Sequence, residues 1–281
     1  MTSIASARHI PPQHPSSPHS GTATRSAGEL VDCFGRVPLT VLGVWAHPDD
    51  ESLLAGGFIA EIIRRGGRVV TVTATAGEHG TDDPTAEPPG ALALRRSREL
   101  DDALLVLGAS PAVHLGYGDG SCSEVAERLA AQLVGGIIDR IRPDLVVTFG
   151  VDGVTGHPDH RAVHRWVCTA VADRADRIPV LGTVTEAVWS TDGIERLHSI
   201  DAFWPGYPIV SHHADGFGIR LDHGLLERKL AALSCHASQM DRVARALGPA
   251  HFVDLAAVEC FVAANQAAHD HLSQEVAARA A

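Results

Sequence analysis

Lysine is nearly absent from this sequence, since it occurs once, at Lys229. A lysine Schiff-base mechanism would have to use that single residue, so the sequence does not favour such chemistry. Cysteine is also sparse. None of the five cysteines is paired at Cys-x-x-Cys spacing, which argues against a redox pair and against a cysteine-type zinc site. Scattered thiols of this kind are typical of reduced, mostly buried cysteines in a cytoplasmic protein.

Long apolar runs and a net positive charge are missing as well. No run approaches the ~20 apolar residues that span a bilayer. The formal net charge is -11, and an acidic chain binds nucleic acids and anionic membranes poorly, so we expect neither as a partner. The glycines between Gly116 and Gly120 form Gly-x-Gly-x-Gly, not the dinucleotide-binding Gly-x-Gly-x-x-Gly, which disfavours a nucleotide-dependent oxidoreductase. The sequence leaves a homo-oligomer open.

Two parts are expected along the 281 residues. The first 28 residues are rich in Ser, Pro, Ala and Thr and contain no acidic residue, so we expect a disordered leader over residues 1–36. Residues 37–281 then form one domain. Strand-like runs alternate there with amphipathic segments, which predicts an α/β fold: a Rossmann-like, mostly parallel sheet with helices on both faces. The alanine-rich tail from Asp254 is expected to be a closing helix.

An acidic turn with one imidazole follows the first expected strand. The apolar run Val41–Val44 leads into Trp-Ala-His47-Pro-Asp49-Asp50-Glu51, and a helical pattern comes next. A helix dipole favours carboxylates at its N-terminus, but this does not explain the whole motif. His47 and Asp50 are three residues apart across a turn, so they can direct a nitrogen and an oxygen toward one divalent cation.

A second histidine turn supplies a further candidate ligand. Gly-His157-Pro-Asp159-His160 follows the apolar run Leu145–Phe149, which is typical of a buried parallel strand. If the two strands are neighbours, both turns open at the same edge of the sheet, where sites form in open α/β folds. We therefore expect a metal site formed by His47, Asp50 and His160. Zinc suits these ligands, and iron(II) or another divalent ion fits two histidines and a carboxylate as well.

Taken together, the two motifs resemble the PIG-L/LmbE-like family of zinc-dependent N-acetylglucosamine-type deacetylases. Further segments resemble that family in the same order along the chain. They are Thr75–Gly80, Arg96 with Glu99, Leu115–Gly120, and Lys229 followed by His236-Ala-Ser-Gln239. The resemblance covers residues 38–240 and implies a small amino-sugar substrate.

The resemblance also implies roles for individual residues. Asp49 matches the general base that activates a metal-bound water, and His157 matches the histidine that stabilises the oxyanion or protonates the leaving amine. Asp159 would orient His157. Arg96 would reach a substrate oxygen or pair with Glu99 on the surface. Asp119, in the glycine loop, is a candidate contact for a sugar hydroxyl.

The sequence departs from the family at one position. Several bacterial members carry a tyrosine two residues before the second histidine motif, where this chain has Thr155. Either His157 then assists the oxyanion alone or another donor, such as Tyr117, replaces the tyrosine. The expected activity is hydrolysis of an N-acyl group on an N-acetylglucosamine-type sugar or glycoside. The alternatives are an amidase for a thiol-conjugated glucosamine amide and a non-catalytic metal- or sugar-binding protein.

Overall fold

The computed structural model describes residues 24–35, 38–172, 174, 177–185, 191–206 and 216–280. Its strands are β1 (Thr24–Ser26), β2 (Thr40–Trp45), β3 (Arg68–Thr73), β4 (Val113–His114), β5 (Leu145–Phe149), β6 (Val180–Thr183), β7 (Phe217–Arg220) and β8 (Val258–Ala263). Its helices are α1 (Ala27–Asp32), α2 (Asp50–Arg64), α3 (Pro89–Leu107), η1 (Cys122–Glu124), α4 (Glu127–Ile141), α5 (Gly153–Gly156), α6 (Pro158–Ala172), α7 (Thr191–His198), α8 (His223–Cys235), α9 (Ala237–Ala256) and α10 (Gln266–Ala280).

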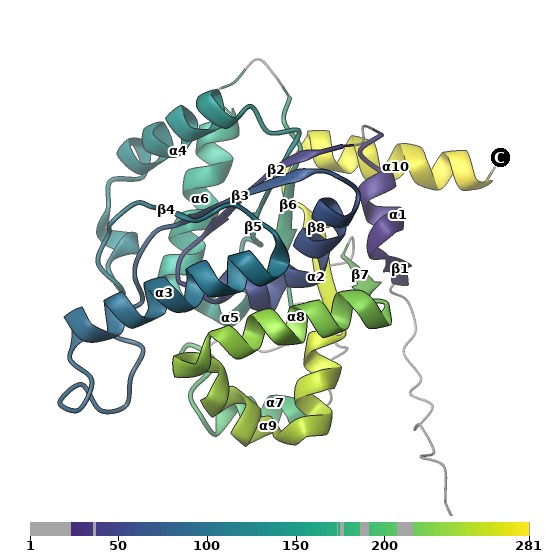
Figure 1. Ribbon diagram of the computed structural model, residues 1–281. Helices are drawn as coiled ribbons and strands as arrows, with labels where there is room; N and C mark the ends of the chain where they lie inside the picture. The colour runs from purple at the N-terminus through teal and green to yellow at the C-terminus, as the bar shows by residue number, and fades with distance from the viewer. Residues whose placement is uncertain are drawn as a thin grey trace, which may run out of the picture.

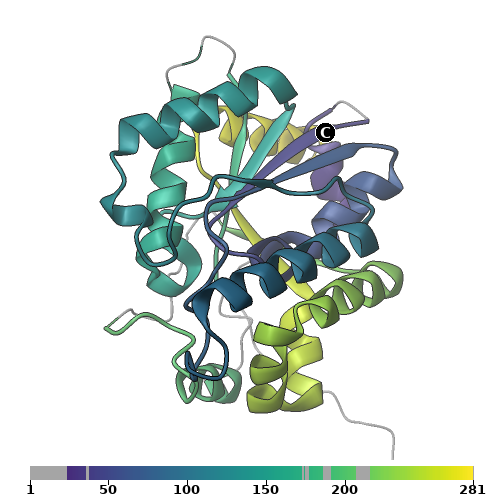
Figure 2. The same ribbon diagram turned by 60° about the vertical axis from the view of Figure 1, so that its left-hand side comes forward.

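The strands form one sheet in the order β1-β7-β8-β6-β5-β2-β3-β4. All neighbouring strands are parallel except β8, which runs antiparallel to both β6 and β7. Helices α4 and α6 pack together on one face, while α2, α3 and α8 cover the other (Figures 1 and 2). The predicted fold class, an α/β fold with a mostly parallel sheet, is confirmed.

The central pair β2 and β5 determines where a site can form. The two strands are parallel, with Gly43 opposite Val147, so their carboxyl ends meet at one edge of the sheet. All five residues of β5 are buried, as the continuous apolar run predicted. Both histidine turns therefore leave the sheet side by side, which is the arrangement that the metal-site hypothesis requires.

The boundary expected for the leader was wrong in part. Residues 24–35 are ordered, because Ser26 and Glu29 form a capping box at the start of α1 and Leu30 and Val31 are fully buried. The rest of the predicted leader, residues 1–23, lies outside the described residues. No helix of the described ranges is long and apolar enough to cross a membrane.

The prediction of one closing helix from Asp254 was also wrong. The tail contains the end of α9, then strand β8, then α10. The β-branched and aromatic run Val258-Glu-Cys-Phe-Val262 lies between the alanine-rich stretches and favours a strand. Strand β8 inserts between β6 and β7, an antiparallel placement that local sequence does not encode.

The single lysine belongs to a buried ion pair that joins three elements. Lys229 of α8 is fully buried, and its Nζ donates to Glu259 Oε1 of β8 at 2.9 Å. The same carboxylate accepts from the backbone N–H groups of Gly57 and Phe58 in α2, at 2.7 and 2.9 Å. The pair therefore fixes α2, which begins at the acidic turn, against the sheet.

We expect Lys229→Met to lower the free energy of unfolding by about 3–5 kcal/mol, because it leaves a buried carboxylate without its counter-charge. Urea unfolding followed by circular dichroism measures the change. Arg228→Met is the matched control, since it removes an exposed cation one position earlier in the same helix. Equal stabilities for the two variants would contradict the assignment.

A candidate metal centre and active site

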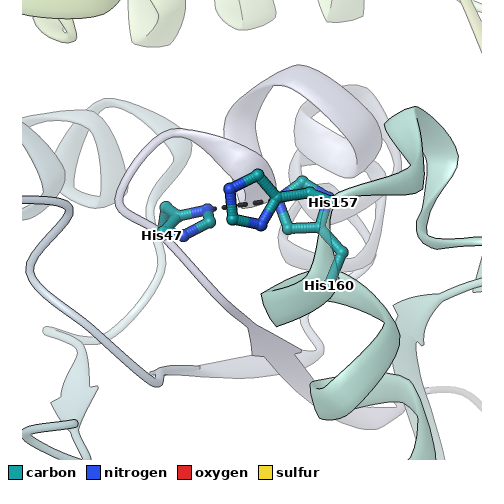
Figure 3. Close-up of side chains that lie close together, drawn as sticks. All are labelled: His47, His157 and His160. Carbon is teal, nitrogen blue, oxygen red and sulfur yellow. Dashed lines mark hydrogen bonds between the residues drawn. The ribbon is translucent and has the colours of Figure 1, made fainter. Parts of the chain in front are cut away.

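His47 presents different partners to its two ring nitrogens. Its Nε2 lies 3.1 Å from Asp119 Oδ1 and 3.4 Å from Asp159 Oδ2. Ionised carboxylates only accept hydrogen bonds, so in the neutral ring Nε2 carries the proton and Nδ1 keeps a lone pair. That lone pair faces His160, whose Nε2 is 3.1 Å from His47 Nδ1 (Figure 3).

His160 directs its own lone pair toward the same point. Its Nδ1 lies 2.9 Å from the carbonyl oxygen of Gly153, which can only accept, so Nδ1 is the donor and Nε2 carries the lone pair. The ring also stacks on Phe149 at a centroid distance of 4.1 Å. Two lone pairs 3.1 Å apart repel each other unless a proton or a cation lies between them.

Asp50 completes a set of three donors around that point. Its Oδ2 lies 3.7 Å from His47 Nδ1 and its Oδ1 lies 3.4 Å from His160 Nε2. Ligand atoms at ~2.0–2.1 Å from a tetrahedral ion are roughly 3.3 Å apart. The donors of His47, Asp50 and His160 therefore have separations that fit a divalent cation, and all three residues are buried.

The protonation of the His47 and His160 rings depends on whether a cation is bound. Burial alone would lower the pKa of His47, but Asp119, Asp159 and Asp50 outweigh it and raise this pKa to about 10. Burial, followed by the charge of His47, lowers the pKa of His160 to about 3. The raised pKa favours a second proton on the His47 ring when no cation is bound, and a cation held at Nδ1 would displace that proton.

His157 lies beside the two other rings. Its ring centroid is 4.9 Å from that of His47 and 5.0 Å from that of His160, and possible ligand atoms of the three residues lie within 4.8 Å of one another. Its Nδ1 accepts a hydrogen bond from the backbone N–H of Asp159 at 3.2 Å. The remaining nitrogen, Nε2, then carries the proton in the neutral ring, which suits a hydrogen-bond donor better than a metal ligand.

We expected the carboxylate of Asp159 to orient His157, but its contacts lie elsewhere. It accepts from the backbone N–H groups of Gly120 and Cys122, at 2.8 and 3.0 Å, and lies beside His47. Because Asp159 lies in the first turn of α6, its backbone N–H, and not its carboxylate, faces His157. Asp119 is likewise engaged by the protein, because its other oxygen accepts from the N–H of His79 at 2.9 Å. Both carboxylates thus fix the orientation of His47.

Asp49 occupies a strained turn next to the three donors. Its φ is 118°, a value that costs a non-glycine residue about 1–3 kcal/mol. Arg96 holds this turn: its Nη2 donates to Pro48 O at 2.6 Å and to Asp49 Oδ2 at 3.2 Å, and its Nη1 donates to Gly77 O at 2.9 Å. Burial raises the pKa of Asp49 to about 6, while the Arg96 charge opposes the rise. Arg96 is buried, so the alternative of a surface pair with Glu99 was wrong.

A buried pair that the motif search did not single out supports the same turn. Glu51 Oε2 accepts from the N–H of Asp49 at 3.1 Å, and its Oε1 accepts from His236 Nε2 at 3.0 Å. His236 belongs to the His-Ala-Ser-Gln segment, whose Gln239 also donates to Gly80 O at 2.9 Å. The only sequence signal for this contact was that segment, which lies 185 residues from Glu51.

The His236–Glu51 pair predicts a pH-dependent stability. Burial would lower the pKa of His236, but Glu51 and then Asp49 raise it against the opposing charge of Arg96. Burial would raise the pKa of Glu51, but His236 and hydrogen bonds lower it. Stability from a raised pKa is complete below the unfolded value and is lost as pH rises through the folded one. Stability from a lowered pKa is lost as pH falls.

We therefore expect the unfolding free energy of wild type to exceed that of His236→Gln most between pH 4.5 and 6.5, the ordinary pKa values of the two groups. The difference should shrink above pH 6.5, by at most about 1.4 kcal/mol per pH unit. Urea titrations between pH 5 and 9 measure it, with the exposed His223→Gln as control. A difference that grew with pH would contradict the ion pair.

Two other expectations concern residues near the site. Tyr117 does not line the cavity above the candidate metal centre; the centroid of its ring lies 5.2 Å from that of Trp166. Thr155, in contrast, does line the cavity. A further histidine, His164, donates from Nδ1 to Phe149 O at 2.8 Å and so has a packing role. The cavity itself has a volume of about 460 Å³.

Solved structures share this fold. An N,N'-diacetylchitobiose deacetylase from Pyrococcus horikoshii matches with a TM-score of 0.53 and 24% identity, over 77% of this chain and 76% of that one. The deacetylase of the A40926 pseudoaglycone matches with a TM-score of 0.58 and 21% identity, over 79% of this chain and 96% of that one. At these identities the likeness establishes the fold alone.

Sequence relatives are closer. The family model described as PIG-L, GlcNAc-PI de-N-acetylase, matches residues 42–171. A 1D-myo-inositol 2-acetamido-2-deoxy-alpha-D-glucopyranoside deacetylase of Mycobacterium sp. (strain KMS) is 36% identical over 249 residues, which are 78% of this chain and 80% of the relative. The Corynebacterium diphtheriae protein of the same name is 30% identical over 71% of this chain and 75% of that protein. This chain therefore belongs to the PIG-L/LmbE-like deacetylase family.

Proposed function

We propose that this protein is a metal-dependent amidohydrolase that removes the acetyl group from an N-acetylglucosamine-type sugar or glycoside. The observation that carries the proposal is the convergence of two imidazole lone pairs, from His47 and His160, beside the Asp50 carboxylate. The names of the relatives support the substrate class, because those proteins are deacetylases of a 2-acetamido-2-deoxyglucopyranoside.

The chain's own residues divide the chemistry. His47 Nδ1, His160 Nε2 and one oxygen of Asp50 would hold the cation, and zinc suits these donors. When bound, such an ion polarises a carbonyl oxygen and makes a water molecule acidic enough to lose a proton near neutral pH. Asp49 accepts that proton at its carboxylate, which Arg96 holds in place at 3.2 Å.

His157 assists at the carbonyl oxygen. Because its Nδ1 accepts from the Asp159 backbone, its Nε2–H is available to donate to the oxygen as negative charge develops there. Asp49 then returns the proton to the leaving amine. We assign Arg96 and Asp119 to positioning Asp49 and His47, and both also line the cavity in which the sugar would lie.

Release of free amine and acetate from N-acetylglucosamine compounds tests this function, with purified protein assayed before and after chelation and after zinc is restored. Hydrolysis that disappears with chelator and returns with zinc supports the proposal. Cleavage restricted to thiol-conjugated glucosamine amides would replace the deacetylase with an amidase. Binding of sugar without turnover in metal-loaded protein would indicate a non-catalytic binder. Turnover unaffected by chelator would contradict the metal mechanism.

A further inference from the structure

Helix α3 presents a regular stripe of exposed residues to solvent. The members of the stripe are spaced alternately three and four residues apart, so they share one face of the helix. They are Ala91, Leu94, Arg98, Asp101, Leu105 and Gly108, and all six are exposed. Leu94 is 64% exposed and Leu105 77%, which is the largest fraction among the exposed large hydrophobics of the described chain. The stripe therefore holds apolar surface that the fold itself does not cover.

The opposite side of α3 packs on the rest of the molecule. Leu100, Ala103 and Leu107 are fully buried, and the helix contacts α8 and α2. Arg96, which holds the turn at Asp49, belongs to this buried side as well. In Figure 1 the helix lies at the front of the molecule, with no other helix or strand of the described chain drawn over it. The stripe is thus an unpartnered face of a well-packed helix.

The order of residues along the stripe is symmetric in size and opposite in charge. Read from either end, a small residue comes first, at Ala91 or at Gly108, and a leucine comes second. The two charged residues meet in the middle, Arg98 on one side of the centre and Asp101 on the other. Neither has an ion-pair partner among the residues that the structure describes. A surface with this order is complementary to a copy of itself that runs in the opposite direction.

A second copy of α3 laid antiparallel across the stripe meets a suitable residue at each position. Leu94 of one copy faces the partner's Leu105. Arg98 of one copy faces the partner's Asp101, because both pairs are centred on the same point of the helix. Alternation of three and four residues is also the spacing by which paired helices form a coiled-coil seam. A parallel copy would instead place Arg98 against Arg98, which is repulsive.

We infer that α3 is a dimerisation surface whose partner is a second copy of this chain, paired antiparallel about a two-fold axis between Arg98 and Asp101. The charge order selects this partner, because an apolar segment would leave both charges without a counter-charge. The contact consists of one helix pair, so it belongs to the small interfaces, and we expect a weak dimer that depends on concentration. This inference goes beyond the proposed function and does not depend on it.

Charge reversals in the full-length protein test the pairing. Arg98→Glu brings two acids together at each contact of the homodimer, and Asp101→Arg brings two arginines together. Each change should weaken dimerisation by about tenfold or more. An equimolar mixture of the two variants should dimerise like wild type, since each copy then carries the charge that the other needs. Sedimentation equilibrium between roughly 1 µM and 1 mM protein measures the masses.

The leucines of the stripe have a matched control on another helix. Leu94→Gln should weaken the dimer by about tenfold, because the two-fold axis removes the side chain at two places at once. Leu129→Gln of α4 removes a leucine of the same 64% exposure that lies off the stripe, and it should leave the dimer unchanged. Both side chains are exposed, so neither change disturbs the core, and circular dichroism checks that both variants are folded.

Three results would overturn the inference. One is a wild-type protein that stays monomeric over the whole concentration range. Another is a dimer or larger assembly that Arg98→Glu and Leu94→Gln leave unchanged, because its contacts would then lie on a different face. The third is a mixture of the two charge variants that associates no better than either variant alone, because the effect would then arise within one chain. The masses are measured without substrate, so the result stands whether or not N-acetylglucosamine compounds are hydrolysed.

Discussion

Asp49→Asn is expected to slow hydrolysis of an N-acetylglucosamine substrate by about 10²–10⁴-fold, the usual contribution of a positioned general base. Metal content should stay at the wild-type level. The amide has the shape of the carboxylate and can still accept from Arg96 Nη2, so the strained turn keeps its contact. The change thus removes proton acceptance with little effect on the fold.

The split between activity and metal content follows from the geometry of the turn. Asp49 and Asp50 are neighbours, but the Asp50 carboxylate faces His47 and His160 while the Asp49 carboxylate faces Arg96. The backbone N–H of Asp49 donates to Glu51 and is unaffected by the substitution. Only one of the two adjacent acids is therefore placed to hold the cation.

Amine release under single-turnover conditions and metal analysis of the same samples measure the two effects. Asp102→Asn is the matched control, because it removes an exposed carboxylate of α3, the helix that carries Arg96. Wild-type turnover in Asp49→Asn would show that another group is the base. Loss of metal together with activity would place Asp49 among the ligands.

The sequence predicts the neighbouring positions of the two histidine turns for a simple physical reason. Apolar runs that are buried on both faces indicate parallel strands, and parallel strands present their carboxyl ends to one edge. The structure pairs β2 with β5, and it brings His47 Nδ1 to 3.1 Å from His160 Nε2, with one Asp50 oxygen 3.7 Å from the first nitrogen and the other 3.4 Å from the second. The spacing within each turn and the shared edge of the two strands together led to the expectation of this cluster, and the metal it would hold stays a prediction.

The supporting contacts were not predictable in the same way. Asp159 is two residues from His157, yet its carboxylate contacts His47, because that choice depends on the loop containing Gly120. The His236–Glu51 contact depends on how α2, α8 and α9 pack against one another. Such contacts follow from tertiary packing, which has no local periodicity.

Loss of the metal centre is the second large effect that we expect. His160→Gln should weaken zinc binding by more than 100-fold and reduce deacetylation to the metal-free background. Residues that only orient a ligand typically contribute 10–100-fold to metal affinity, and a direct ligand contributes more. Glutamine can still donate to Gly153 O, so the loop after β5 keeps its contact.

Graded variants distinguish a ligand from a residue that merely stabilises the site. Asp119→Asn should weaken zinc binding by only 10–100-fold, because it alters the partner of His47 Nε2 and leaves Nδ1 in place. His164→Gln, a change at a buried histidine one turn further along α6, should leave zinc affinity near wild type. Competition with a chromophoric chelator measures all three affinities. If His160→Gln bound zinc as tightly as His164→Gln, the two facing lone pairs would not mark the metal position, and the proposed mechanism would lose its centre.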